Sequence, residues 1–251
     1  MRLAILQNLK FHTKIPNMDA PQVYKIAIAD DEKLFLNGLS MVINQHPSIE
    51  TLILANNGQD LIQKIDNSKD ILPDLILCDL DMPILNGIDT TRLLNEKYPQ
   101  IKIIILSSHY DPTLILKMLE LGASAYMPKN EEPEVVFETI LGVLKNGFHY
   151  NNFVLKVIRE KLNLKSKSEN SDIKLTLREK EILELICQQK TNLEIGQQLY
   201  ISKRTVEGHR KKLLDKTNSK NTAGLIIFAI QHGYFDVELQ FSQWNKLNNL
   251  N

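Results

Sequence analysis

Three aspartates in the first half of the chain have the spacing and the surroundings of a metal-dependent site. Asp30 and Asp31 come directly after one apolar run, and Asp79 comes directly after another. The carboxyl ends of neighbouring parallel strands lie about 5 Å apart, so three carboxylates placed there repel one another. A divalent cation relieves this repulsion. Ligands that are all oxygen favour Mg²⁺, which readily bridges a carboxylate and a phosphoryl group.

Two further polar residues follow the next apolar runs. Ser107 follows the run 103–106, and Lys129 follows the run 125–128. A hydroxyl and an ammonium at the same edge suit a bound phosphoryl group, so the chemistry predicted is transfer of a phosphoryl group to Asp79. Taken singly, each residue is explained as a helix cap, a turn residue or a solvated charge; together, at the ends of four runs, they favour the site.

The elements that must position these residues are short apolar runs alternating with longer amphipathic segments. The runs do not alternate apolar with polar residues, which is typical of strands buried on both faces. We predict strands at 24–29, 51–55, 75–78, 102–106 and 125–127, and helices at 32–45, 58–67, 86–98, 112–121 and 133–146. This order predicts an α/β domain with a five-stranded, doubly wound, flavodoxin-like parallel sheet.

The second half of the chain has a wholly helical pattern. The segments 176–179 and 191–194 both have the Thr-x-x-Glu sequence of a capping box. Ser202 can cap a third helix, and Gly233 can end a fourth over 222–232. Four helices of this length match a small all-α domain.

Apolar residues over 195–206 have the spacing of a helix-turn-helix. The outer face of its second helix carries residues that a helix in the major groove uses for base edges and phosphates. We predict DNA contacts from Lys203, Arg204, Thr205, Glu207, Gly208, Arg210 and Lys211. For this helix alone, a solvated charged face is an equal alternative.

The net charge of the 251 residues is zero, but it is unevenly distributed. Residues 23–150 hold 10 Lys and Arg against 18 Asp and Glu, a net of −8, whereas residues 173–235 hold 11 against 6, a net of +5. The basic part is compatible with nucleic acid and the acidic part is not.

Cys78 and Cys187 lie in apolar stretches and are expected to be reduced core thiols. No apolar run approaches the roughly 20 residues that span a membrane, and the start has no signal-peptide pattern. These features predict a cytoplasmic protein without a membrane partner.

The first half resembles a response-regulator receiver domain over about residues 23–150. The matching motifs are Ala29-Asp30-Asp31-Glu32 with Gly38-Leu39, Asp79-Leu80-Asp81-Met82-Pro83 with Gly87, then Ser107, Tyr126 and Lys129. The resemblance implies that Asp79 is the phospho-acceptor. It implies Mg²⁺ held by Asp30, Asp31, Asp79 and the main-chain carbonyl of Asp81. Ser107 would bond the phosphoryl group, Lys129 would pair with it, and Tyr126 would be the switch residue that swings inward. Glu32 and Asp81 lie where such domains vary.

The second half resembles the DNA-binding domain of the NarL/LuxR (NarL/FixJ) family from about Leu175 to Phe235. The matching segments are 175–183, 191–196 and 201–210. Gly208 is a departure, because many relatives carry a larger residue there. The resemblance implies dimerisation, often through the last helix, which is apolar enough for a core face and a partner face.

The two resemblances together imply a two-component response regulator that is not an enzyme. A sensor histidine kinase would phosphorylate Asp79, after which the receiver would stop covering the DNA-binding domain, dimerise, or both. The homodimer would bind paired half-sites in double-stranded DNA and control transcription, with RNA polymerase as a further candidate partner.

We predict five segments along the chain. They are an N-terminal extension at 1–22, the receiver at 23–150, a linker at 151–172 with a short helix at 151–163, the helix-turn-helix domain at 173–235 and a tail at 236–251. Met18 is an alternative start, close before the first strand.

Two alternatives remain open at this point. Asp79-Leu80-Asp81 also matches the Asp-x-Asp of aspartyl-phosphate phosphatases of the haloacid dehalogenase type, in which the second Asp is a general acid. The upstream Asp pair, Met82-Pro83 and the attached helical domain argue against it. The other alternative is a phosphorylation-independent binding protein whose receiver only mediates dimers, and the complete acidic cluster argues against that.

Overall fold

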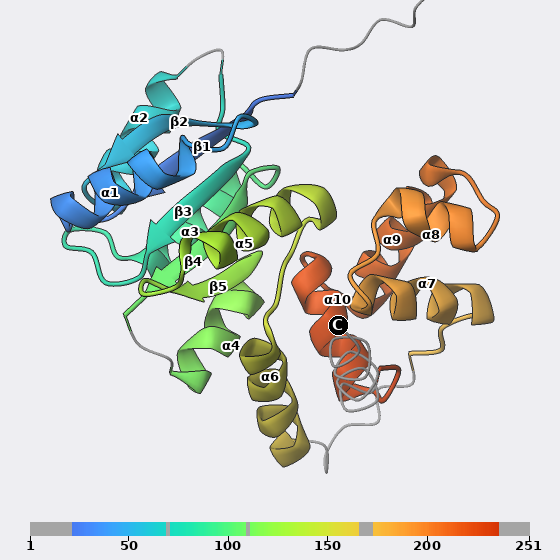
Figure 1. Ribbon diagram of the computed structural model, residues 1–251. Coiled ribbons are helices and arrows are strands. Elements are labelled where there is room, and N and C mark those ends of the chain that lie inside the picture. Colours follow the sequence, from blue (N-terminus) through green and yellow to red (C-terminus); the bar gives the residue numbers. More distant parts are fainter. Residues whose placement is uncertain (1–21, 69–70, 109–110, 166–172, 236–251) are drawn as a thin grey trace, which may run out of the picture.

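Five strands form one parallel sheet in the first half of the molecule (Figure 1). The computed structural model describes residues 22–68, 71–108, 111–165 and 173–235; Met18 and the predicted tail lie outside them. The strands are β1 (Tyr24–Ala29), β2 (Ile49–Ala55), β3 (Leu75–Asp79), β4 (Lys102–Ser107) and β5 (Ala125–Pro128). Their order is β2-β1-β3-β4-β5 and all pairs are parallel, which confirms the doubly wound α/β prediction.

Helices cover both faces of this sheet, because successive strand residues point to opposite sides. On one face, α1 (Lys33–Ile43) and α5 (Pro133–Asn146) bury their apolar residues against Ile26 and Ile28. On the other, α2 (Gly58–Asn67), α3 (Gly87–Lys97) and α4 (Pro112–Leu121) pack against Ala27, Ala29 and Ile76. The inner strands β1, β3 and β4 are therefore largely shielded from water on both sides, whereas the edge strand β2 is partly exposed.

The strand ends differ from the prediction by one residue at the edge that matters for the site. Asp79 and Ser107 are the last residues of β3 and β4, whereas the sequence pattern had them follow these strands. Asp79 is paired with Leu106 and Ser107 with Pro128, so the parallel ladder continues through both polar residues. Their side chains are therefore held by regular sheet rather than by a loop.

The second half contains the four predicted helices, α7 (Leu177–Cys187), α8 (Asn192–Gln198), α9 (Lys203–Thr217) and α10 (Thr222–Gln231). Both capping boxes are present, and the Ser202 side chain accepts from the Thr205 amide at the start of α9. Gly233 has a φ of 67° just after α10, as expected for a left-handed terminator. These local signals fix where each helix begins and ends.

A further helix, α6 (Asn152–Lys165), occupies the first part of the predicted linker and runs two residues beyond the short helix predicted there. It packs against both α4 and α10 and buries Val154, Val157 and Ile158. One continuous apolar cluster therefore runs from the face of the sheet under α4, through α6, to helices α7 to α10. Figure 1 shows α6 between α4 and α10.

Cys78 and Cys187 are buried free thiols, as predicted. Within the described residues, every helix falls short of the length and apolar character needed to cross a membrane.

Ile84, in the loop between β3 and α3, has an unfavourable backbone conformation. Its φ is 70° and its side chain is 77% exposed, so a β-branched residue takes a left-handed conformation with little packing in return. Such a residue costs about 1–3 kcal/mol.

Replacing Ile84 with Gly is expected to raise the free energy of unfolding by about 1 kcal/mol, because glycine removes the strain at a smaller cost in unfolded-state entropy. Urea denaturation measures this change. Leu34→Gly is the matched control, because Leu34 is also highly exposed (89%) but lies within helix α1. Glycine is unfavourable in a helix, so this substitution should lower the free energy of unfolding by about 1 kcal/mol. A lower free energy of unfolding for both variants would contradict the proposed strain.

Candidate functional site

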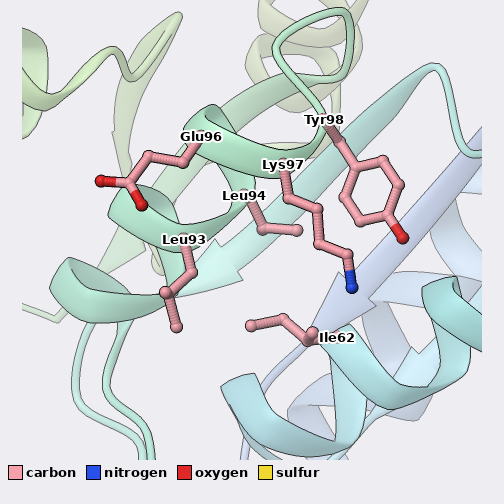
Figure 2. Close-up of a pocket in the computed structure, with 6 residues that line it drawn as sticks. All are labelled: Ile62, Leu93, Leu94, Glu96, Lys97 and Tyr98. Carbon is pink, nitrogen blue, oxygen red and sulfur yellow. The ribbon is translucent and has the colours of Figure 1, made fainter.

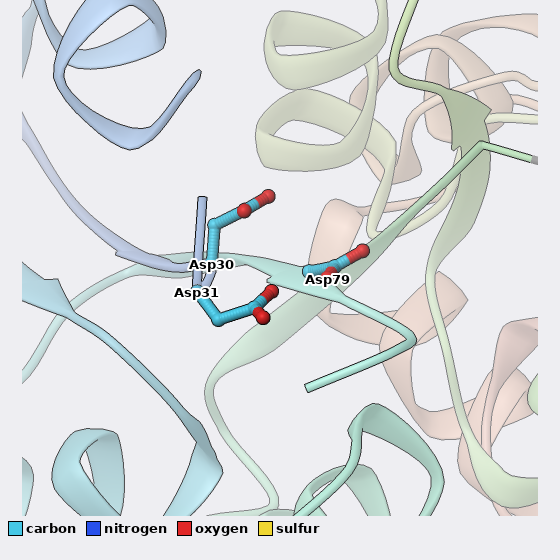
Figure 3. Close-up of side chains that lie close together, drawn as sticks. All are labelled: Asp30, Asp31 and Asp79. Carbon is cyan, nitrogen blue, oxygen red and sulfur yellow. The ribbon is translucent and has the colours of Figure 1, made fainter. Parts of the chain in front are cut away.

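The three predicted carboxylates lie together at the carboxyl edge of the sheet. Asp30 and Asp31 follow β1 and Asp79 ends β3, the neighbouring strand. A carboxylate oxygen from each lies within 4.8 Å of the other two, and Figure 3 shows the three side chains side by side. Asp30 is 0% and Asp79 2% exposed, whereas Asp31 faces solvent. The cluster is therefore buried on one side and open on the other.

Burial makes the ionised forms of the inner carboxylates unfavourable. It raises the pKa of Asp79 to about 6, with a further contribution from the negative charge of Asp30 and a partial offset from Lys129. Burial likewise raises the pKa of Asp30, against the lowering effect of its hydrogen bond from Lys129. Positive charge placed beside this cluster therefore favours the ionised forms of both carboxylates.

Lys129 provides one positive charge to the cluster. Its ammonium nitrogen lies 2.9 Å from Asp30 Oδ2, 2.9 Å from Glu32 Oε1 and 3.2 Å from Asp79 Oδ1. The Lys129 amide donates to the Ser107 carbonyl at 2.9 Å, which extends the β4–β5 ladder and aims the side chain back over the site. Burial alone would lower the pKa of Lys129, but the hydrogen bonds to Glu32 and Asp30 raise it above its usual value.

Ser107 and Tyr126 lie beside the carboxylates on β4 and β5. Ser107 is 1% and Tyr126 3% exposed, and their hydroxyls are hydrogen-bonded to each other. Burial raises the pKa of Tyr126, and the Ser107 hydrogen bond opposes this. The tyrosine predicted to swing inward is thus already buried in this structure, next to the hydroxyl predicted to bind a phosphoryl group.

The donor set fits a hard divalent cation. Asp30, Asp31 and Asp79 offer oxygen ligands only, and Lys129 neutralises just one of their charges. Asp81 is exposed in the loop that follows β3. These residues could hold Mg²⁺, which accepts carboxylate and carbonyl oxygens and keeps several waters on its open side.

The largest difference from the predicted DNA-contact set concerns Arg210. The other six residues of the set are exposed on α9: Lys203, Arg204, Thr205, Glu207, Gly208 and Lys211. The Arg210 guanidinium instead donates to Asn192 Oδ1 at 3.0 Å and to Thr222 Oγ1 at 2.8 Å. It is half-buried and ties α9 to the N-terminal ends of α8 and α10, which gives it a structural part within the domain. Space around Gly208 is open, so a closely approaching ligand would meet no side chain there.

Helix α10 is covered by the receiver. It packs against α4 and α6, and a Cβ at Gly122, the C-cap of α4, would lie 3.1 Å from Asn221 Nδ2, at the N-cap of α10. Burial lowers the pKa of Lys102, at the start of β4, and the charge of Arg210 lowers it further. The covered surface thus contains two cations that repel each other.

A groove between α2 and α3 lies apart from the carboxylates (Figure 2). It is lined mainly by apolar side chains and by the stem of Lys97, whose ammonium is paired with Asp66 at 2.6 Å. Its lining shares no residue with the acidic cluster: Ile62, Leu93, Leu94, Glu96, Lys97 and Tyr98.

Two site residues were missed by the sequence interpretation. Glu32 was treated as uninformative because its position varies among receiver domains, yet it contacts Lys129 directly. Lys102 was regarded only as the start of a strand. The position of Glu32 immediately after the Asp pair was the available signal, whereas Lys102 depends on how the two halves pack.

Sequence comparisons match both halves of the chain to known families. The response regulator receiver domain matches residues 26–141, and the domain of bacterial regulatory proteins of the luxR family matches residues 174–229. These matches leave no support for the phosphatase alternative.

Curated relatives match along nearly their whole length. Transcriptional regulatory protein DegU of Brevibacillus brevis is 30% identical, covering 85% of this chain and 95% of the relative. Transcriptional regulatory protein MctR of Rhizobium johnstonii is 32% identical, covering 83% and 94%. Oxygen regulatory protein NreC of Staphylococcus haemolyticus is 31% identical, covering 84% and 99%.

Solved structures have a similar fold. A two-component response regulator of the LuxR family from Aurantimonas sp. is 23% identical with a TM-score of 0.51, covering 56% of this chain and 98% of that one. The RcsB response regulator of Salmonella typhimurium is 20% identical with a TM-score of 0.51, covering 82% and 98%. Because both family descriptions match and the curated relatives are 30–32% identical over most of the chain, the chain belongs to the two-component response regulators that join a receiver domain to a LuxR-type DNA-binding domain.

Proposed function

We propose that phosphorylation of Asp79 by a sensor histidine kinase controls binding of the second domain to DNA. The observation that carries this proposal is the position of Asp79: it is buried at the centre of the carboxyl edge, between two aspartates and the Lys129 ammonium. No other described group of acidic residues combines three carboxylates this close with a lysine.

In the proposed reaction, a carboxylate oxygen of Asp79 attacks the phosphorus of the kinase phosphohistidine. The new O–P bond forms as the P–N bond breaks, and the histidine nitrogen leaves with the electron pair and takes up a proton. Asp30, Asp31, Asp79 and the Asp81 carbonyl would hold Mg²⁺, which when bound neutralises charge on the phosphoryl oxygens. Lys129 orients the group by pairing with one of its oxygens.

Ser107 is the residue that transmits the change. Its hydroxyl exchanges the hydrogen bond with Tyr126 for one with the phosphoryl group, which carries roughly −1.5 to −2 charge in analogous modifications. Ser107 ends β4 and Tyr126 lies within β5, and the segments that follow these strands lead into α4 and α5. The surface of α4 that packs against α6 and α10 is thereby altered.

Release of α10 is the proposed output. A homodimer formed through this apolar helix requires that α4 and α6 no longer cover it, and the exposed face of α9 is then presented twice, to paired half-sites. A nearly complete switch requires about 5.5 kcal/mol of differential stabilisation. Domain limits at 23–150 and 173–235 suit this scheme, with α6 as the element between them.

The proposed partners are the kinase, double-stranded DNA, a second copy of the chain and RNA polymerase. The chain acts as a regulator rather than as an enzyme. Because it must meet DNA, we place its action in the cytoplasm.

Asp79→Asn should abolish the response of DNA binding to a phosphodonor, because the amide cannot accept a phosphoryl group. The measurement is affinity for a duplex selected from random-sequence DNA, with and without acetyl phosphate and Mg²⁺. Asp89→Asn, a partly exposed aspartate of α3, is the control and should respond like wild type. If wild type and Asp79→Asn bind alike under both conditions, the phosphorylation-independent alternative stands and the receiver only mediates dimers.

Lys102→Glu should strengthen the contact between the domains, because an attraction to Arg210 replaces a repulsion. We expect about five- to tenfold weaker DNA binding by the unphosphorylated protein, in the range of ordinary coupling energies. Lys117→Glu makes the same charge change on an exposed position of α4 and should have little effect. Equal weakening by both variants would point to a general effect of charge and would contradict the role of the covered surface.

Arg204→Ala should weaken DNA binding and lower its dependence on salt. If Arg204 neutralises a phosphate, the slope of log affinity against log salt falls by about 0.9, and the loss is similar on all sequences. If it contacts a base edge, the loss is confined to the selected sequence. Binding across a salt series distinguishes the two. Lys174→Ala, an exposed lysine outside α9, is the control; an effect as large as that of Arg204→Ala would argue against α9 as the reading helix.

A further inference from the structure

Glu32 occupies an unusual place at the carboxyl edge of the sheet. It is the N-cap of α1, but its side chain makes no cap hydrogen bond. Its Oε1 instead accepts from the Lys129 ammonium at 2.9 Å, and its amide donates to Asp30 Oδ1, also at 2.9 Å. The side chain is 63% exposed. A solvent-exposed carboxylate thus reaches into the centre of the candidate site.

The Lys129 ammonium is shared among three carboxylates, and its contact with Asp79 is the longest. The distances are 2.9 Å to Asp30, 2.9 Å to Glu32 and 3.2 Å to Asp79. An ammonium has three N–H donors and no acceptor, and its contact with Glu32 Oε1 has hydrogen-bond geometry. A phosphoryl group on Asp79 would be a fourth anion beside Lys129, and it competes with these three carboxylates for the same donors.

The three partners differ in how easily they can be released. Asp30 is fully buried, and removing its cation would leave an unpaired charge away from water. Asp79 becomes the esterified residue itself. Glu32 is exposed, and water can replace the ammonium at its carboxylate at little cost, as for other exposed ion pairs. Glu32 is therefore the partner that exchanges.

We propose that Glu32 is a positioning residue that competes with the phosphoryl group for Lys129. In the unphosphorylated protein, Glu32 holds the Lys129 ammonium toward β1. Glu32 must release this ammonium when a phosphoryl group on Asp79 needs a counter-ion. Glu32 thereby lowers the affinity of the site for a tetrahedral anion and favours the unphosphorylated form. It takes no part in forming or breaking bonds. This inference rests on the proposed function of Asp79.

The test is calorimetric titration of the full chain with beryllofluoride, a phosphoryl analogue, in the presence of Mg²⁺. Glu32→Gln should bind the analogue about two- to fivefold more tightly than wild type, the range expected for one exposed ion pair. Titration with Mg²⁺ alone should give equal or weaker binding, because a negative charge has been removed. Opposite changes of this kind separate a positioning role from damage to the fold, which would weaken both affinities.

Glu32→Asp distinguishes the contact from the charge. The shorter side chain keeps the charge but cannot reach Lys129, so it too should tighten binding of the analogue. Glu134→Gln removes an exposed carboxylate in the first turn of α5 and should leave both affinities unchanged. Unaltered binding by Glu32→Gln overturns the proposal, as does a Glu32→Asp variant that behaves like wild type or a Glu134→Gln variant that matches Glu32→Gln.

Two further results concern the proposed function itself. Wild type should bind the analogue and Asp79→Asn should not. If wild type fails to bind it, the function proposed for Asp79 is wrong and the role of Glu32 falls with it. If wild type binds and only the Glu32 variants behave unexpectedly, the phospho-acceptor stands and the competition for Lys129 does not.

Discussion

The positive charge of Lys129 allows four carboxylates to stand at one edge of the sheet. Two of them, Asp30 and Asp79, are buried, and a buried carboxylate without a counter-ion takes up a proton or destabilises the fold. The lysine follows β5, three strands away from β1, and its backbone is fixed by the bond to the Ser107 carbonyl. The sheet order is thus what brings a single cation over anions that are far apart in the sequence.

The same sheet connects the charged edge to the second domain. Ser107 and Tyr126 end or occupy the strands nearest α4, and α4 packs against α6 and α10 without a break in the apolar cluster. A change of hydrogen bonding at the site can therefore reach α10 through packed side chains alone. The charges of Lys102 and Arg210 oppose each other across this packing, because the charge of Arg210 lowers the pKa of Lys102 in addition to the lowering by burial.

Local patterns in the sequence account for most of the fold and for the five principal site residues. Apolar runs predicted the strands, and the polar residues at the ends of these runs predicted the site. Both features can be recognised from short stretches of sequence, without knowing how distant parts of the chain pack. The contact of Glu32 depends on the direction in which an N-cap side chain points. The inward turn of Arg210 depends on acceptors contributed by α8 and α10. The packing of α6 against α4 and α10 depends on residues distant in the sequence. The polar residues that follow α6 in the sequence led to the prediction of a linker there.

Helix α6 restricts the length of the connection between the receiver and the DNA-binding domain, because its buried face must point toward both α4 and α10. Its buried residues Val154, Val157 and Ile158 form one stripe, and a helix turns by about 100° per residue. Inserting or deleting a single residue ahead of this stripe would rotate it away from α4 and α10, whereas a change of seven residues would nearly restore it. A chimera that joins another receiver to this output domain through α6 is therefore expected to keep the contact between its halves only at helix lengths that preserve this rotation.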